Sequence, residues 1–372
     1  MTATPVFLFG TLRDAALRAC VFGADLPASP AWLPGAEARR AAGAEWPVLV
    51  PAPGTRAPGL LVTPPAEALA RADYYEGLFG YARVPATVET GAGATAAEHW
   101  RPDGAAPEAA EAWDFAAWQA RHAPLARLAA EEAMALRGAR PPEETARRWH
   151  LIRARAQARL NAARPAPTTL RHSARPGDVE VVARRVCYAA FFSVEEYDLR
   201  HARFDGAMSE TIRRAAFVSA DAVTVLPYDP ARDRVMVIEQ VRAGPLARGD
   251  VEPWSLEAIA GRIDPGEAPE ETARREALEE ARLAVGELIR LAGYYPTPGA
   301  KSEFLHSYLG LADLPETAAG LGGVAHEHED IRAHVIGFDR LMGLVESGEA
   351  NNAPLILSAL ELARRREGLR AG

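Results

Sequence analysis

The spacing of the apolar residues changes along the chain, and it predicts strands near the start, helices in the middle and further strands later. Apolar runs at residues 5–12 and 59–63 predict buried strands, and the alternation at 81–88 predicts another strand. Residues 66–75 predict a helix that leads into this last strand. Between residues 106 and 165 the apolar positions recur at helical spacing, which predicts helices.

A second strand-rich part follows a linker at residues 164–176, which contains three prolines. Residues 222–227 and 234–240 are apolar and are separated by the turn-forming sequence DPARD, so they predict a β-hairpin. The remaining predicted elements are strands at 288–295 and 304–311 and helices at 338–347 and 353–366. Strands around one central helix favour a mixed α/β domain.

Length and composition narrow the class of protein. The 372 residues suffice for two or three domains, and 48% hydrophobic with 25% charged residues is typical of a soluble globular protein. The net charge of −8 argues against nucleic acid or an anionic membrane as a partner. No apolar run is long enough to span a bilayer. Two distant cysteines, Cys20 and Cys187, favour a reducing cytoplasm.

The segment GRIDPGEAPEETARREALEEARL, at residues 261–283, carries the clearest chemical signal. Pro269 suits the first turn of a helix, because that turn leaves backbone N–H groups unpaired and proline has none. Glu276, Glu279 and Glu280 then share one helix face. Like charges on one face repel, so the segment predicts a site for a hard divalent cation, Mg²⁺ or Mn²⁺.

An ordinary solvated helix face would explain the acidic run, but it would not explain the whole spacing. Gly261, Glu267 and Arg275 precede the carboxylates at fixed intervals, and with them the segment resembles the Nudix box. This box is the metal-binding loop and helix of hydrolases that cut nucleoside diphosphates linked to another moiety. The family usually has glycine where Arg282 stands. Either a left-handed helix end at Arg282 costs about 1 kcal/mol, or the helix runs on towards Gly286.

Segments outside the box resemble bacterial ADP-ribose pyrophosphatases of the Nudix family over nearly all of residues 178–370. They include LRHARFDGAMSE, IEQVRAG, PWSLEAIAGRID and YYPTPGAKSEF, and Pro296 and Pro298 follow the box as in that family. The resemblance implies an α/β/α sandwich and Mg²⁺-dependent hydrolysis of ADP-ribose to AMP and ribose 5-phosphate, with Mn²⁺ as the alternative ion. A hydrolase of another nucleoside diphosphate sugar and a regulatory protein that binds ADP-ribose are the alternatives.

The same resemblance implies a set of metal ligands and a general base. The implied ligands are the carbonyl of Ala260 and the carboxylates of Glu276, Glu279, Glu280 and Glu329. Glu327 is the implied general base. Glu329 is its rival, because the loop that carries both residues lies over the substrate in the family and either carboxylate can be presented.

Substrate contacts and a partner are implied as well. Phe191 would stack on adenine, and Arg214 and Arg242 would hold the phosphates or the terminal ribose. On the residues alone, Phe191 is more often a core residue, and both arginines are compatible with surface ion pairs. Residues 179–192 resemble the part that family members exchange between subunits, so a homodimer is expected.

The sequences FGTLRD and DYYEGLFGYARVPATV, within the first hundred residues, resemble the γ-glutamylcyclotransferase-like (AIG2-like) family, a small mixed β-barrel. The resemblance implies that the backbone of Gly10, Thr11 and Leu12 holds a γ-glutamyl group and that Glu76 is the general acid/base. A degenerate domain kept for packing or regulation is an equal alternative. The expected organisation is a cyclotransferase-like domain at 1–105, a helical connector and linker at 106–170, and a Nudix domain at 171–372.

Overall fold

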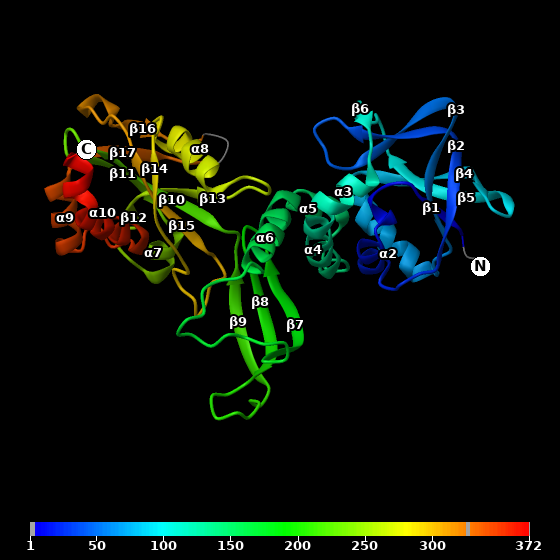
Figure 1. Cartoon of the computed structure of the whole chain (residues 1–372), viewed down its shortest axis with the longest axis horizontal. Coiled ribbons are helices and arrows are strands. Elements are labelled where there is room, and N and C mark those ends of the chain that lie inside the picture. The colour runs from blue at the N-terminus through cyan, green and yellow to red at the C-terminus, as the bar shows by residue number, and fades with distance from the viewer. Residues whose placement is uncertain (1–3, 325–327, 372) are drawn as a thin grey trace. The chain divides into compact units, whose positions relative to one another are not determined.

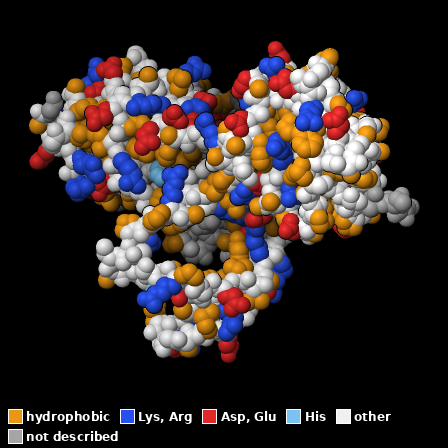
Figure 2. Space-filling view, turned by 45° about the vertical axis from the view of Figure 1, so that its right-hand side comes forward, with side chains coloured by type: hydrophobic (Ala, Val, Ile, Leu, Met, Phe, Trp, Pro, Cys, Tyr) orange, Lys and Arg blue, Asp and Glu red, His pale blue; other side chains and the backbone are white. Residues whose placement is uncertain are grey.

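The computed structural model describes residues 4–324 and 328–371, and the chain divides into two compact units (Figure 1). The first unit contains Met1–Ser173 and Tyr188–Phe191, and the second contains Ala174–Cys187 and Phe192–Gly372. Within the described residues, no helix has both the length and the apolar character needed to cross a membrane. Basic and acidic side chains are interspersed over the face shown in Figure 2.

The first unit is built around a small barrel. Its strands are β1 (Val6–Leu8), β2 (Ala28–Ala41), β3 (Pro47–Val62), β4 (Tyr81–Thr90), β5 (Gly93–Pro102) and β6 (Ala109–Ala112). They are ordered β3-β1-β5-β4-β2-β6, and an additional pairing of β3 with β2 closes the barrel. Because β1 pairs in parallel with β5 and the other pairs are antiparallel, the predicted mixed barrel is confirmed. The side chains of Phe7, Phe9, Ala31, Val88 and Ala97 fill a core cluster.

Helices cover the barrel and follow it in the chain. They are η1 (Thr11–Arg13), α1 (Ala15–Phe22), α2 (Ala66–Gly77), α3 (Phe115–Arg121), α4 (Ala123–Ala135), α5 (Pro142–Ala146) and α6 (Trp149–Ala162). Residues 109–162, which the sequence suggested as part of a connector, form β6 and α3 to α6 and belong to the first unit.

Two ion pairs with buried carboxylates hold these helices in place. Asp14 is 1% exposed, caps α1 through the Leu17 backbone N–H, and accepts hydrogen bonds from Arg127 of α4 at 2.8 and 2.6 Å. Burial alone would raise the pKa of Asp14, but these hydrogen bonds, with another from Gln119, lower it to about 2. A second buried pair, between Arg155 and Glu132, joins α6 to α4. Removing one partner of such a pair would leave an uncompensated buried charge.

The second unit is a layered α/β structure. Its large sheet has the order β14-β15-β10-β11-β17-β16, with β12 beside β11 and β13 beside β10. These strands are β10 (Ala222–Asp229), β11 (Arg234–Val241), β12 (Trp254–Glu257), β13 (Ile259–Arg262), β14 (Leu288–Tyr294), β15 (Leu305–Leu311), β16 (Gly320–Gly322) and β17 (Ile331–Gly337). A smaller sheet contains β7 (Val179–Ala189), β8 (Ser193–His201) and β9 (Ile212–Val218).

Helices pack on both faces of the large sheet. The helices of this unit are α7 (Ala243–Arg248), α8 (Pro269–Ala281), α9 (Phe338–Ser347) and α10 (Ala353–Ala371), with the short η2 (Glu316–Ala318). Val223, Val225 and Ile238 of the sheet pack in one core with α8, while Leu226 and Val237 pack in another with α9 and α10. Alternate strand residues point to opposite faces, which confirms the predicted α/β/α sandwich. The predicted hairpin forms between β10 and β11.

Candidate functional site

Helix α8 carries the acidic face of the box. In its first turn the Glu271 carboxylate accepts a hydrogen bond from the Ala268 backbone N–H at 2.9 Å, which satisfies a donor that the helix leaves open. The helix ends because Arg282 is left-handed, with φ 51° and ψ 31°. The helix therefore does not run on towards Gly286, and Arg282 bears the conformational cost that glycine would avoid.

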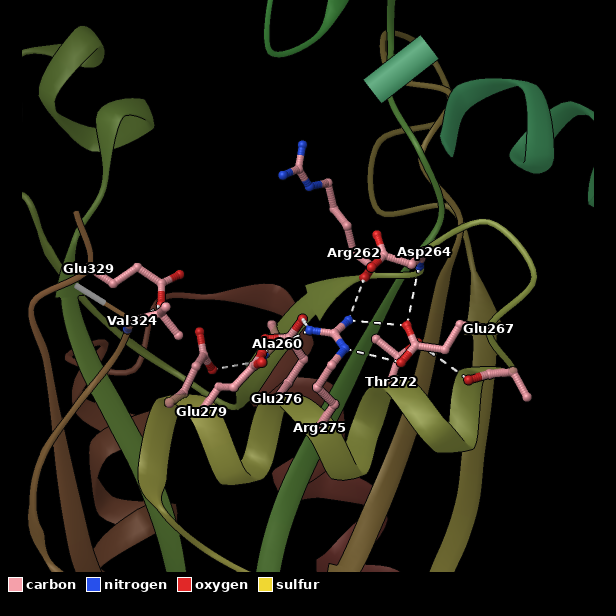
Figure 3. A network of polar contacts seen from close by, with 12 residues as sticks. Ala260, Arg262, Asp264, Glu267, Thr272, Arg275, Glu276, Glu279, Val324 and Glu329 are labelled. Atoms are coloured by element: carbon pink, nitrogen blue, oxygen red, sulfur yellow. Dashed lines mark hydrogen bonds and ion pairs between the residues drawn. The ribbon is translucent and has the colours of Figure 1, made fainter. Parts of the chain in front are cut away.

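The carboxylates of α8 differ in their contacts. Glu280 is 2% exposed, and its Oε2 accepts a hydrogen bond from the Ala260 backbone N–H at 3.0 Å. Glu276 and Glu279 accept hydrogen bonds from Nη1 of Arg275 at 2.7 and 2.9 Å (Figure 3). Since Ala260 belongs to β13, the acidic face lies between the helix and this strand.

Arg275 joins the loop before α8 to the helix itself, as the dashed lines of Figure 3 show. Its Nε donates to Glu267 Oε1 at 3.0 Å, and its Nη2 donates to the carbonyl oxygen of Arg262 at 3.2 Å. Glu267 also accepts hydrogen bonds from Thr272 Oγ1 at 2.7 Å and from the Asp264 N–H at 3.3 Å. The spacing of Glu267 and Arg275 in the sequence therefore serves to position the loop before α8.

Burial and mutual repulsion dominate the electrostatics of this face. Burial raises the pKa of Glu280 to about 8; repulsion from Glu276 and Glu329 adds to the rise, and the hydrogen bond from Ala260 opposes it. Burial likewise raises the pKa of Glu276 to about 7, although Arg275 opposes the rise. Glu329 contributes to both shifts, so its carboxylate is close to the helix.

The donor chemistry of this face fits a divalent cation. In the described part of the chain, no three acidic, histidine or cysteine side chains are gathered closely enough to hold a metal as they stand. Glu276 and Glu279 are engaged with Arg275 instead. The negative charge of buried carboxylates is nevertheless unfavourable, and a bound divalent cation would compensate it. Carboxylate oxygens are the donors that Mg²⁺ or Mn²⁺ prefers.

Two glycines leave room for the acidic helix. A Cβ at Gly261 would lie 1.9 Å from the carboxylate carbon of Glu276. A Cβ at Gly322 would lie 1.8 Å from the backbone oxygen of Glu280. Any other residue at either position would have to displace the acidic helix or the strand beside it.

An arginine–carboxylate pair lies beside the acidic face. Arg242 donates from Nε and Nη2 to the two oxygens of Glu257, at 2.9 and 2.7 Å. Burial lowers the pKa of Arg242, but Glu257, Glu280 and Glu329 together outweigh it and raise the pKa. The structure thus brings Arg242 close to Glu280 and Glu329. Glu257 was not predicted, although an acidic residue in the otherwise apolar stretch before Ala260 was a signal for it.

The other residues implied by the Nudix resemblance have different surroundings. Glu327 lies outside the described residues, whereas Glu329 accepts a hydrogen bond from the Val324 N–H at 3.2 Å. Arg214 lies exposed on β9, in the smaller sheet, and donates to the carbonyl oxygen of Arg213 at 2.8 Å. Phe191 is 62% exposed, lies in the turn between β7 and β8, and is grouped with the first unit. The described chain therefore does not gather Arg214 with the carboxylates of α8.

A cavity of about 90 Å³ in the first unit brings together the second set of predicted residues. Gly10, at the start of η1, and Thr11 and Leu12 of η1 line it, and Glu76 lines it from α2. Burial raises the pKa of Glu76 to about 8, and repulsion from Asp73 adds to the rise. No hydrogen bond or ion pair joins the Glu76 side chain to another described residue. An unpaired acid beside a glycine loop can exchange a proton with a bound molecule.

Two family models match the chain. Residues 218–357 match the model described as NUDIX domain. Residues 6–119 match the model described as Gamma-glutamyl cyclotransferase, AIG2-like. The first match contains α8 and its carboxylates, and the second contains the barrel together with Glu76.

Known relatives each match about half of the chain. ADP-ribose pyrophosphatase of Escherichia coli (strain K12) is 39% identical over 193 residues, which are 52% of this chain and 91% of that protein. ADP-ribose pyrophosphatase of Haemophilus influenzae is 32% identical over 182 residues, which are 48% of this chain and 83% of that protein. GDP-mannose pyrophosphatase of Pectobacterium atrosepticum is 28% identical over 179 residues, which are 48% of this chain and 91% of that protein.

Proposed function

This chain belongs to the Nudix family of hydrolases, and from this we propose that its second unit hydrolyses the diphosphate of ADP-ribose to AMP and ribose 5-phosphate. The observation that carries the proposal is the buried acidic face of α8, where Glu276 and Glu280 lie beside Ala260 and Arg242. The relatives of highest identity named above are ADP-ribose pyrophosphatases, which supports this substrate over other nucleoside diphosphate sugars.

In the proposed reaction, the oxygen of a water molecule bonds to one phosphorus of the diphosphate while the bridging P–O bond breaks. The bridging oxygen leaves with the other phosphate, and the proton of the water passes to a carboxylate. A divalent cation, which we propose is Mg²⁺ with Mn²⁺ as the alternative, would neutralise charge on the phosphates and polarise their oxygens. The residues proposed to hold it are Ala260, Glu276, Glu279, Glu280 and Glu329.

We assign the proton transfer to Glu327 and keep Glu329 as its rival. The position of Glu329 supports this alternative, because its charge contributes to the raised pKa of Glu276 and Glu280. Glu327→Gln is expected to lower kcat by about 10²–10⁴-fold with little change in the Mg²⁺ dependence. If Glu329→Gln had that effect instead, while Glu327→Gln kept near-full kcat, the two roles would be exchanged.

Arg242 is the substrate contact that the structure supports best. Both Nε and Nη2 are bonded to Glu257, which fixes the plane of the guanidinium and leaves Nη1 for a phosphate or ribose oxygen. Arg214 of β9 and Phe191 of the turn between β7 and β8 are proposed to contact the substrate in the second copy of a homodimer. Cytoplasmic location is proposed from the cysteine content, which is low for a secreted protein.

A substrate panel tests the proposal. Purified full-length protein with Mg²⁺ should cleave ADP-ribose with the highest kcat/KM among ADP-ribose, ADP-glucose, GDP-mannose, NADH and diadenosine polyphosphates, with AMP as a product. Glu280→Gln should weaken Mg²⁺ binding and shift the Mg²⁺ optimum upward. A clearly higher kcat/KM for GDP-mannose would instead favour a different nucleoside diphosphate sugar. Binding of ADP-ribose without any cleavage would favour a regulatory role.

For the first unit we propose γ-glutamyl cyclotransfer, supported by the unpaired Glu76 in a cavity with the Gly10–Leu12 loop. The α-amino nitrogen of a γ-glutamyl amide would bond to the γ-carbonyl carbon, and the C–N bond to the amine would break. Glu76 would take the proton from the attacking nitrogen and give it to the leaving amine, so that 5-oxoproline and a free amine result. Release of 5-oxoproline that is lost in Glu76→Gln would support this, whereas no turnover on a broad γ-glutamyl panel would favour a structural domain.

A further inference from the structure

We propose that the cavity of the first unit contains a second subsite, formed by helices α4 and α6. This subsite binds the amine half of a γ-glutamyl amide when the N-substituent carries an aromatic ring and no charged group. This inference rests on the proposed cyclotransferase function for its γ-glutamyl half. The aromatic half follows from Trp149, which lies beyond the segment that matches the cyclotransferase family model, together with Phe79 and Trp46 within it.

Part of the cavity wall lies outside the matched segment, which ends at residue 119. Leu125, Ala126 and Ala129 line the cavity from α4, and Trp149 and Arg153 line it from α6. Helix α4 is joined to α1 and to α6 by ion pairs whose carboxylates, Asp14 and Glu132, are buried. A substrate that fills the cavity therefore meets these two helices as well as the glycine loop.

Buried polar contacts hold the added wall rigid. The Glu132–Arg155 pair locks α4 to α6, and the Asp14–Arg127 pair locks α4 to the start of α1. Both acids in these pairs are almost fully buried, at 1% exposure each. A rigid wall loses little conformational entropy when it binds a ligand, which is what a specific subsite requires.

Trp149 of the added wall joins two aromatic rings of the matched segment, Phe79 and Trp46. The ring of Trp149 meets the ring of Phe79 at 5.3 Å between centroids and at 89°, and Phe79 meets Trp46 at 5.5 Å. All three rings line the cavity and are only half-buried, so part of each ring remains open to a ligand. Another ring placed there would extend an edge-to-face cluster, and each such pair contributes about 1 kcal/mol beyond the burial of its area.

The charges at this end of the cavity compensate each other. Arg153 Nη2 lies 2.7 Å from Glu45 Oε1, and both residues line the cavity. His122 Nδ1 lies 3.5 Å from the same Glu45 oxygen. A charged amine half, such as a free amino acid, would have to break the Arg153–Glu45 pair to be bound. An N-substituent with an aromatic ring and no charged group packs against the rings of the cavity and leaves this ion pair intact.

Three amides that differ by one group each test the proposal. The full-length protein should process γ-glutamyl-phenethylamine with a kcat/KM about tenfold or more above that of γ-glutamyl-ethylamine, which lacks the ring. It should also prefer γ-glutamyl-phenethylamine to γ-glutamyl-phenylalanine, which has the same ring and an added carboxylate. Equal kcat/KM for the phenethyl and ethyl amides, or a preference for the carboxylated amide, would overturn the inference while the cyclotransferase function stands.

Substitutions of Trp149 test whether the preference for the phenethyl amide depends on α6. Trp149→Ala should remove most of the advantage of the phenethyl amide, mainly through KM, and leave turnover of the ethyl amide within about twofold. Trp149→Leu keeps the apolar bulk, so it should fold normally and still lose most of the advantage of the phenethyl amide. Trp254→Ala is the matched control, because Trp254 is 59% exposed in the second unit. An equal loss for both amides in Trp149→Leu would show that Trp149 only supports the fold.

Calorimetry with Glu76→Gln separates binding from turnover, using γ-glutamyl-phenethylamine as the ligand. Binding that exceeds that of γ-glutamyl-ethylamine, together with no turnover by the unmodified protein, would support the aromatic subsite and overturn the cyclotransferase function. Neither binding nor turnover of any of the three amides would overturn both.

Discussion

At the scale of single residues, Gly261 lies close to a carboxylate that we propose binds the metal. Because its Cβ would lie 1.9 Å from the Glu276 carboxylate carbon, Gly261→Ala must move that carboxylate. A shift of about 1 Å in a reacting group costs roughly 10²-fold in rate, so kcat for ADP-ribose should fall by about that factor and the Mg²⁺ requirement should rise. Gly343→Ala in α9 is the control, since its Cβ meets nothing within 4 Å and kcat should not change. Full kcat in Gly261→Ala would show that Glu276 is not used where the structure places it.

The pKa of Glu76 predicts a pH-dependent effect on stability. Its pKa of about 8 in the folded chain is above the value of 4.5 for a free carboxyl, so this group's contribution to stability is complete below pH 4.5 and is lost as the pH rises through 8. Glu76→Gln has no carboxyl to ionise at this position, so it should not lose this stability as the pH rises. The variant should match the unmodified protein at pH 4.5 and be more stable at pH 8.5, by about 2 kcal/mol after allowance for water in the cavity.

Tryptophan fluorescence during urea unfolding measures this difference. Trp254 is the only tryptophan of the second unit, so the other six report on the first. The Glu76→Asp variant, which retains a carboxyl, is the control and should lose stability with rising pH as the unmodified protein does. Parallel stability curves for Glu76→Gln and the unmodified protein from pH 4.5 to 8.5 would contradict the raised pKa.

Residues whose role depends on local spacing were predictable, and residues whose role depends on a distant strand were not. Glu276 and Glu280 follow from the helical repeat, because residues four positions apart share a face. Glu257 is brought to Arg242 by the pairing of β11 with β12, and no spacing in the sequence encodes that pairing. Arg275 was identified as part of a pattern, but its contacts with Glu267 could be seen only in three dimensions.

At the scale of elements, the end of α8 departs from the family pattern. Arg282 takes the left-handed conformation that glycine adopts without steric cost. Arg282→Gly should therefore raise the free energy of unfolding of the second unit by up to about 1 kcal/mol, and Arg282→Ala should give no gain because alanine has the same restriction. Thermal unfolding by calorimetry, with both variants compared at one pH, measures the difference. An equal gain from alanine would show that the arginine side chain, not its backbone, carries the cost.

The helices of residues 106–165 show the limit of periodicity at this scale. Their existence was predictable, because apolar positions recur at helical spacing. Periodicity shows that a face is buried, but it does not show what covers the face. The structure places α4 and α6 against the cavity of the barrel, where Trp149 becomes part of the wall. Helices that the sequence suggested as a connector thus form part of the wall of a candidate site.

At the scale of the whole molecule, each candidate site is built within one unit. The cavity with Glu76 uses residues of the first unit, and the acidic face of α8 uses residues of the second. Both fold classes were expected from the resemblance of the sequence motifs to two families, whereas periodicity alone predicted strands and helices. The unit boundary is less simple than any sequence division, because Tyr188–Phe191, which includes the last residues of β7, groups with the first unit, whereas the rest of β7 and all of β8 belong to the second.

The smaller sheet of the second unit predicts a homodimer. Val181 and Val182 of β7 are 55% and 54% exposed, and neighbouring strand residues point to opposite faces, so both faces of this edge strand are apolar and open. Such an edge is normally covered, because apolar surface in water is unfavourable and an unpaired edge recruits other chains. We expect a second copy to cover it, and light scattering at micromolar concentration should give the mass of a dimer.

Val182→Glu tests this interface, because it would place a charge in an apolar contact. The variant should weaken association by at least about tenfold and shift the measured mass towards the monomer at low micromolar concentration. Leu170→Glu is the matched control, since Leu170 is 98% exposed outside any strand or helix and its replacement should leave the mass unchanged. Hydrolysis of ADP-ribose should fall with dimer content if Arg214 and Phe191 act on the site of the second copy. A monomer with full activity would contradict the dimer and would show that Arg214 and Phe191 do not act on the site of a second copy.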